Sequence, residues 1–164
     1  MKRKLVAYCL GLLAMLYLLG ACSASKEARS MKKTINGDWT LQTINTEGID
    51  ARLKAKIFNE ADLNCFVGSN WNFVSNSSSG SYTLAPNTAG CTPVNRQITW
   101  TIYEPKDAEK EFQFKRMESK NKPMDDNAGF RLNVTALTDH TMQLKSAITF
   151  ENKPGYIVYN FIKK

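Results

Sequence analysis

The stretch GFRLNVTALTDHTMQLKSAITF, residues 129–150, alternates apolar and polar side chains on both sides of a short polar connection. The apolar residues that share one face are Phe130, Leu132, Val134, Met142, Leu144, Ile148 and Phe150. Alternation with period two is typical of β-strands that bury one face. The connection TDH, at 138–140, is too short for a crossover, so the two strands are expected to be antiparallel neighbours.

The same pattern continues over the rest of the chain, with Asn, Gly, Ser and Pro between the alternating segments. The eight expected strands are 37–44, 70–75, 81–85, 97–103, 111–117, 129–137, 141–150 and 155–162. A meandering all-β chain can hide its strand edges by closing into a barrel or by forming a sandwich, and short links favour the barrel. We therefore predict an all-β fold, an eight-stranded antiparallel up-and-down barrel.

One segment departs from the strand pattern. The residues GIDARLKAKIFNEADL, at 48–63, place Leu53 and Ile57 four positions apart among alanines. This spacing and composition favour a helix. The prediction is a short helical insert before the second strand, packed over one end of the sheet.

The first residues, MKRKLVAYCLGLLAMLYLLGAC, have a basic start followed by an uncharged apolar run. This is the layout of a secretory signal peptide, expected over residues 1–21. The end of the run, LGAC, resembles the bacterial lipobox, which implies that Cys22 carries the lipid. The alternative is an uncleaved N-terminal membrane anchor with an incidental cysteine.

The polar residues after Cys22 indicate a lipidated flexible tether over 22–34, followed by a barrel domain over 35–164. Ser23 next to the lipidated cysteine favours the outer membrane, and the sequence does not say whether the domain faces the periplasm or the cell surface. Cleavage removes three of the seven net positive charges. No clustered basic face or nucleic-acid motif remains, so no nucleic acid is expected as a partner.

Two cysteines, Cys65 and Cys91, follow Cys22 in the exported domain. Pairs of cysteines are oxidised in such compartments, which predicts a disulfide between them. The alternative is a redox or metal pair, for which the chain offers no further ligand, because His140 is the single histidine and lies in an expected turn.

The start NGDWTL, with Gly37 and Trp39, resembles the G-x-W element in the first strand of lipocalins. Together with the lipobox, the eight strands and the cysteine pair, residues 34–164 are similar to the lipocalin-like lipoproteins of Gram-negative bacteria. The resemblance implies a barrel closed at one end by Trp39. It does not identify a ligand. The chain departs from the family in three ways: LTDHTM, at 137–142, is only faintly similar to the second lipocalin motif, no terminal arginine is found to stack on Trp39, and the helical insert is atypical.

No catalytic constellation is recognisable. A single histidine excludes the usual catalytic triads and His-based zinc sites, and no G-x-S-x-G turn is present. We therefore expect no enzymatic activity, no cofactor and no metal.

The large apolar residues of the expected strands can line a ligand cavity or simply fill the barrel. They are Trp39, Trp71, Phe73, Tyr82, Trp100, Phe112, Phe114, Phe130 and Met142. The first reading predicts a membrane-anchored envelope protein that binds a small apolar or amphipathic ligand. The second predicts a protein-interaction or inhibitor module of the envelope, with a filled barrel and no small-molecule ligand.

Overall fold

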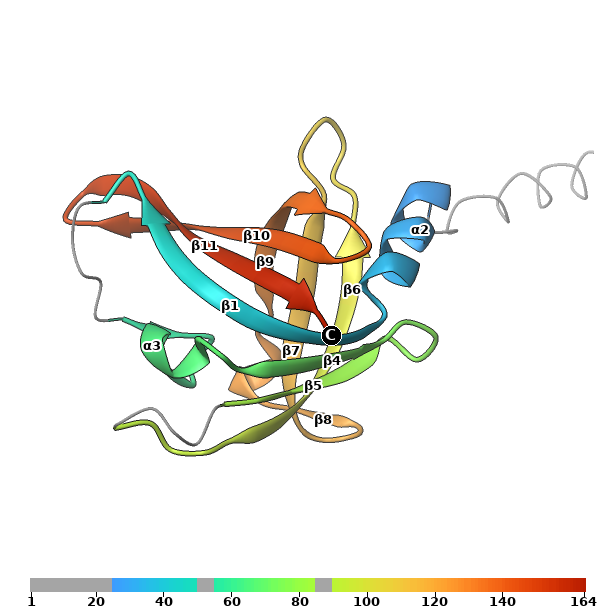
Figure 1. Ribbon diagram of the computed structural model, residues 1–164, viewed down its shortest axis with the longest axis horizontal. Coiled ribbons are helices and arrows are strands. Elements are labelled where there is room, and N and C mark those ends of the chain that lie inside the picture. The colour runs from blue at the N-terminus through green and yellow to red at the C-terminus, as the bar shows by residue number, and fades with distance from the viewer. Residues whose placement is uncertain (1–24, 50–54, 85–89) are drawn as a thin grey trace, which may run out of the picture.

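The computed structural model describes residues 25–49, 55–84 and 90–164, and its main feature is a nine-stranded antiparallel sheet (Figure 1). Eight of its strands are hydrogen bonded in a near-closed ring. These strands are β1 (Gly37–Glu47), β4 (Asn70–Val74), β5 (Ser79–Thr83), β6 (Asn95–Tyr103), β7 (Glu111–Ser119), β9 (Phe130–Leu137), β10 (Thr141–Phe150) and β11 (Lys153–Lys163). The ninth, β8 (Lys122–Pro123), pairs only with β7.

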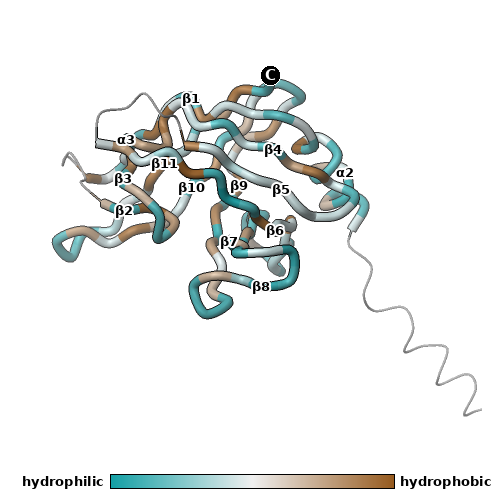
Figure 2. Tube along the Cα trace, turned by 90° about the horizontal axis from the view of Figure 1, so that it is seen from below, coloured by the Kyte–Doolittle hydropathy of each residue, from teal (hydrophilic) through white to brown (hydrophobic). Residues whose placement is uncertain are grey.

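The ring follows the order β6-β5-β4-β1-β11-β10-β9-β7, and β6 pairs with β7 to complete it. Strand β1 lies between β4 and β11, so the two ends of the folded chain meet in the sheet. The eight expected strands and their antiparallel, up-and-down order are therefore confirmed. Figure 2 shows short hydrophobic stretches between hydrophilic ones along the chain.

A β-bulge in β1 changes which of its side chains face the inside of the ring. The register against β11 shifts between Leu41 and Thr43. Trp39 and Leu41 point inward before the shift, and the next residue packed against the core is Ile44. A bulge adds one residue to one strand and so reverses its alternation.

The start of β1 carries the expected Gly-x-Trp arrangement. Gly37 has φ +117°, a conformation that side-chain-bearing residues rarely adopt, and the chain enters the sheet there. The indole N–H of Trp39 donates to the Ile35 carbonyl at 2.7 Å. The Lys163 ammonium lies 5.3 Å from the centre of the Trp39 ring and donates to the Thr34 carbonyl at 2.8 Å. A lysine near the C-terminus thus lies over the Trp39 ring.

The prediction of a flexible tether over 22–34 is wrong for its described part, because Lys26–Ile35 form the helix α2. Residues 22–24, and with them Cys22, lie outside the described residues. Ser25 caps the helix by accepting from the Ala28 N–H at 2.9 Å. Ala28 and Ile35 are buried against the ring. The polar composition hid a buried face with helical spacing. No helix of the described ranges has the length and apolar character to cross a bilayer.

The helix predicted over 48–63 is also wrong for its described part, while residues 50–54 lie outside the description. Strands β2 (Lys56–Ile57) and β3 (Ala61–Asp62) form a small hairpin, and only Leu63–Phe66 form a helix, α3. We call Ala55–Asp62 the plug hairpin. Phe58 and Asn59 have φ of 53° and 52°, in the left-handed region that interrupts a right-handed helix. Tertiary contacts of this turn override the local helix propensity.

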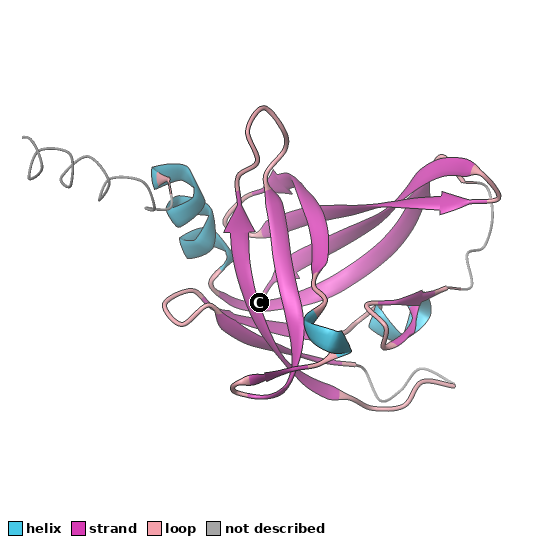
Figure 3. Cartoon of the chain, turned by 180° about the vertical axis from the view of Figure 1, so that it is seen from behind, coloured by secondary structure: helices cyan, strands magenta, loops and turns pink. Residues whose placement is uncertain are grey.

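Strands β9 and β10 of the ring are paired over only part of their length. Their pairing runs only from Met142–Leu137 to Lys145–Asn133. Beyond this point, among the described residues, 146–150 of β10 pair only with β11, and Phe130–Leu132 of β9 pair only with β7. The plug hairpin and the β10–β11 turn lie at the end of the ring away from α2 (Figures 1 and 3).

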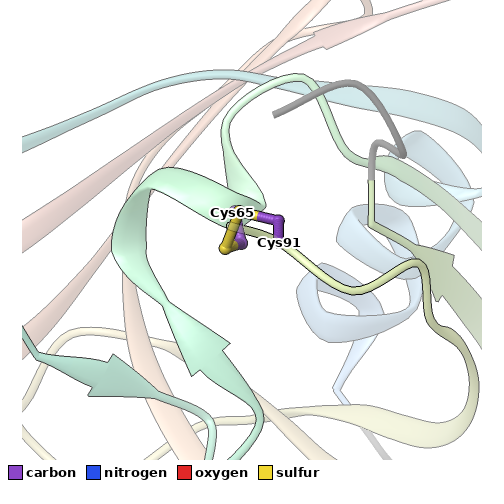
Figure 4. Close-up of a disulfide and its surroundings, with 2 residues drawn as sticks. All are labelled: Cys65 and Cys91. Carbon is purple, nitrogen blue, oxygen red and sulfur yellow. A yellow bond between two sulfur atoms is a disulfide. The ribbon is translucent and has the colours of Figure 1, made fainter. Parts of the chain in front are cut away.

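The predicted disulfide is confirmed. Cys65 of α3 and Cys91, in the segment before β6, are joined with their Cα atoms 5.5 Å apart (Figure 4). Cys65 is buried in α3, directly after the plug hairpin, so the bond ties this region to the segment that enters β6.

Replacing both Cys65 and Cys91 with alanine should lower the free energy of unfolding by about 3 kcal/mol, because the bond closes a loop of 26 residues in the unfolded chain. Urea unfolding of the oxidised protein and the variant measures the difference. Intact mass with and without reductant gives the control: the native protein should gain two hydrogens and the variant none. Equal stability would contradict a stabilising role.

Candidate functional site

The interior of the ring is filled by the large residues that the sequence offered as pocket candidates. Eight of the nine are at most 2% exposed: Trp39, Trp71, Phe73, Tyr82, Trp100, Phe112, Phe114 and Met142. Ring centres lie 4.6 Å apart for Trp71 and Tyr82 and 5.6 Å apart for Trp100 and Phe112. Of the nine, only Phe130 is half-buried, and it lies beside the gap between β9 and β10. That the eight buried residues contact a ligand stays a prediction.

Phe58, at the tip of the plug hairpin, closes this packed interior. It is 8% exposed, and its ring lies 5.0 Å from that of Phe114 and 5.4 Å from that of Tyr159. It also contacts Phe66, Trp71 and Phe130. Phe58 therefore separates the ring interior from the space outside the hairpin.

The next residue but one, Glu60, holds the hairpin to the ring wall. Its carboxylate accepts two hydrogen bonds from Arg96, both at 2.8 Å, one from Arg116 at 2.7 Å and one from the Tyr82 hydroxyl at 2.7 Å. Arg116 also donates to both Asp125 oxygens, at 2.6 and 2.8 Å. Two guanidinium groups and two carboxylates thus balance in charge. We call Glu60, Tyr82, Arg96, Arg116 and Asp125 the latch cluster.

Burial and pairing shift the titration of the latch cluster. Burial alone would raise the pKa of Glu60, but hydrogen bonds from Arg96, Tyr82 and Arg116 outweigh it and lower the pKa to about 2. Burial, and then the adjacent carboxylate, raise the pKa of Tyr82. Hydrogen bonding to Asp125 raises the pKa of Arg116, and the same contact lowers the pKa of Asp125. All four charged groups are therefore ionised at neutral pH, which suits a fixed structural contact.

Acid should weaken the fold through this cluster. The folded pKa of Glu60, about 2, lies below its ordinary value of 4.5, so its stabilisation is complete above pH 4.5 and is lost as the pH falls toward 2. Urea unfolding at pH 7, 4 and 3 measures the loss. A Glu60→Gln variant should lose less stability over this range than the native protein does, whereas Glu118→Gln, at an exposed ion pair, should follow the native protein. Parallel losses in all three proteins would contradict the assignment.

Outside Phe58 lies an open cleft of about 490 Å³, between the plug hairpin and the sheet. Its apolar wall is formed by Ile57, Phe58, Phe130, Ile148, Phe150 and Ile157. The cleft lies along the unpaired parts of β9 and β10. A concave apolar site of this size is within the range of small-molecule pockets.

The floor of the cleft carries one polar pair. The Tyr159 hydroxyl lies 3.2 Å from that of Ser146, across the β10–β11 pair. Burial raises the pKa of Tyr159 to about 12, although the Ser146 contact lowers it slightly. Tyr159 is therefore a neutral phenol at any physiological pH. It can donate or accept one hydrogen bond but supplies no charge.

Two other depressions have different walls. One of about 460 Å³ lies on the outside of β6 and β7, with Thr99, Thr101 and Gln113 in its lining. The other, about 480 Å³, lies between α2 and β9 and includes the ion pair of Glu27 and Lys110. Both are lined by more polar side chains, so the cleft outside Phe58 is the better candidate site.

Comparison with protein-family models, with curated proteins and with solved structures finds no match to this chain.

Sequence patterns missed the latch cluster, although a signal for it was present. Arg116 continues the inward positions of Phe112 and Phe114, and Arg96 continues those of Ile98 and Trp100. A charged residue at an inward position requires a buried partner. The partner itself, Glu60, lies in the segment predicted to be helical, so the pairing could not be read from spacing.

Proposed function

We propose that this protein is an outer-membrane lipoprotein whose near-closed ring is a lipocalin-like barrel, and that it binds a small apolar or amphipathic ligand. The observation that carries the proposal is the cleft of about 490 Å³ with aliphatic and aromatic walls beside the gap between β9 and β10. The ligand lies against Phe58 and Ile148, outside the packed interior.

Three features support the lipocalin-like assignment. The strand order is up-and-down throughout the ring. Trp39 lies at the start of β1 with a cation over its ring. The helix α2 covers the end of the ring where Trp39 and Ile35 meet. The lipobox around Cys22 supports the anchor.

Binding is tested with native mass spectrometry of protein purified from its own host and with titration of a fluorescent fatty-acid analogue. The protein should carry a small molecule, and Ile148→Glu should reduce probe affinity at least about tenfold, because it places a charge on the apolar wall. Val74→Glu is the matched control, since Val74 is a strand residue, 41% exposed, outside the cleft. Absence of both ligand and probe binding would overturn the proposal.

Membrane attachment is tested separately. Cys22→Ala should release the protein from the membrane fraction, because the thiol that takes the lipid is gone. Unchanged membrane association would favour the uncleaved apolar anchor instead.

A second candidate function is supported by one observation. Residues 146–150 of β10, with the sequence SAITF, pair with β11 on one side and with no strand of the described residues on the other. They contain no charge and no proline, the usual protections of an exposed strand edge. Such an edge can add a strand from another protein. An envelope protein-interaction or inhibitor module is therefore the alternative if no small ligand binds.

A further inference from the structure

The mouth of the cleft carries charge of one sign. Its charged lining residues among those described are Lys56, on the plug hairpin, and Arg131, on β9. No carboxylate of the described residues lines the cleft. This arrangement differs from the latch cluster, where two guanidinium groups face two carboxylates.

The two cations are poorly neutralised by the protein. Within the described residues Lys56 makes no ion pair, although Asp62 is opposite it in the β2–β3 register. The closest carboxylate to the Arg131 guanidinium is that of Glu111, at 3.9 Å, and the Arg131 side chain is 70% exposed. In the latch cluster, by contrast, the ion pairs measure 2.6–2.8 Å.

The backbone beside these cations offers further donors. In an antiparallel strand alternate residues direct their N–H groups to opposite sides. Some N–H groups of residues 146–150 therefore point away from β11, toward the mouth, and no described strand accepts from them. Unpaired N–H groups at a sheet edge favour an anion or another strong acceptor.

We propose that the cleft takes a single-chain amphipath with an anionic head, its chain on the apolar wall and its head between Lys56 and Arg131. This inference rests on the proposed binding function and adds the chemical class of the ligand. Carboxylate and phosphate heads share the required charge and acceptor oxygens. A neutral or cationic head would leave both cations unmatched.

Calorimetric titration of the purified full chain with four twelve-carbon probes tests the proposal. The probes are dodecanoate, dodecyl phosphate, dodecanol and dodecyltrimethylammonium. At least one of the two anions should bind about tenfold or more tightly than dodecanol, because its head can accept charge-assisted hydrogen bonds. Dodecyltrimethylammonium should bind most weakly of the four probes. Tighter binding of one anion over the other assigns the head as carboxylate or phosphate.

Two pairs of substitutions locate the effect. The double variant Lys56→Gln with Arg131→Gln should bind the anions no more tightly than dodecanol, while the charge-preserving Lys56→Arg with Arg131→Lys should retain the preference. Lys33→Gln with Lys106→Gln removes the same charge from exposed positions outside the cleft and should leave the preference unchanged. Since all these side chains are on the surface, thermal unfolding should show each variant folded.

The outcomes separate the two proposals. Equal affinity of anions and dodecanol, or an anion preference that persists in the double glutamine variant, would overturn the head-group assignment and leave ligand binding intact. Failure of all four probes to bind the native protein would overturn both.

Discussion

Replacing Glu60 with alanine should lower the free energy of unfolding by about 3–5 kcal/mol, the range measured when one partner of a buried ion pair is removed. The variant leaves Arg116, which is 4% exposed, without one of its two carboxylates, and leaves Arg96 and the Tyr82 hydroxyl without their acceptor. A small domain is stable by only about 5–15 kcal/mol in total, so the loss is severe. Urea unfolding at pH 7 measures it.

Two variants serve as controls for Glu60. Glu118→Ala breaks an exposed i,i+4 pair with Lys122 and should cost less than about 1 kcal/mol. Tyr82→Phe removes one hydrogen bond of the latch cluster and should cost about 1 kcal/mol. If Glu60→Ala costs no more than Glu118→Ala, the cluster does not hold the plug hairpin.

Replacing Phe58 with alanine should also cost about 3–5 kcal/mol, the usual range for an aromatic residue removed from a core. Phe58 fills the position between Phe114 and Tyr159, and the loss of its ring leaves a void that borders the existing cleft. The variant should therefore bind a larger apolar probe than the native protein does. Urea unfolding and titration with fatty-acid analogues of increasing size measure the two effects.

Tyr103→Ala is the matched control for Phe58, because Tyr103 is an aromatic residue that is 47% exposed. It should change stability by about 0.5 kcal/mol or less and leave probe size selection unaltered. A Phe58→Ala variant with native stability and native size selection would show that the hairpin does not close the interior.

The strand content of this protein follows from its sequence because each strand depends on a local pattern. The alternation in 129–150 places Leu132 and Leu144 inward, and both are buried. The cysteine pair was likewise predictable, since the signal peptide and lipobox expected from the sequence take up Cys9 and Cys22 and leave one pairing. Several strands are longer than predicted, because the end of a strand depends on its hydrogen bonds to the neighbouring strand.

The two wrong predictions, the helix over 48–63 and the flexible tether over 22–34, have one physical cause: contacts with distant parts of the chain. In 48–63 helix propensity was weak, and burial of Phe58 with four hydrogen bonds to Glu60 outweighed it. In 22–34 the polar composition concealed Ala28, whose helical spacing to Ile35 becomes meaningful only when the ring provides a surface to cover.

By itself the sequence determined the β-rich class, the eight strands, their up-and-down order and the disulfide, because these depend on period-two alternation, short turns and residue chemistry. Only the tertiary structure decided which parts of the protein are filled by side chains and which part is left open as a cleft. It filled the ring with aromatic side chains, placed Phe58 across one end, and left the cleft beside the unpaired residues 146–150 of β10. Whether a side chain fills an interior or lines a cavity depends on which distant segments pack against it, and local periodicity carries no information about those contacts.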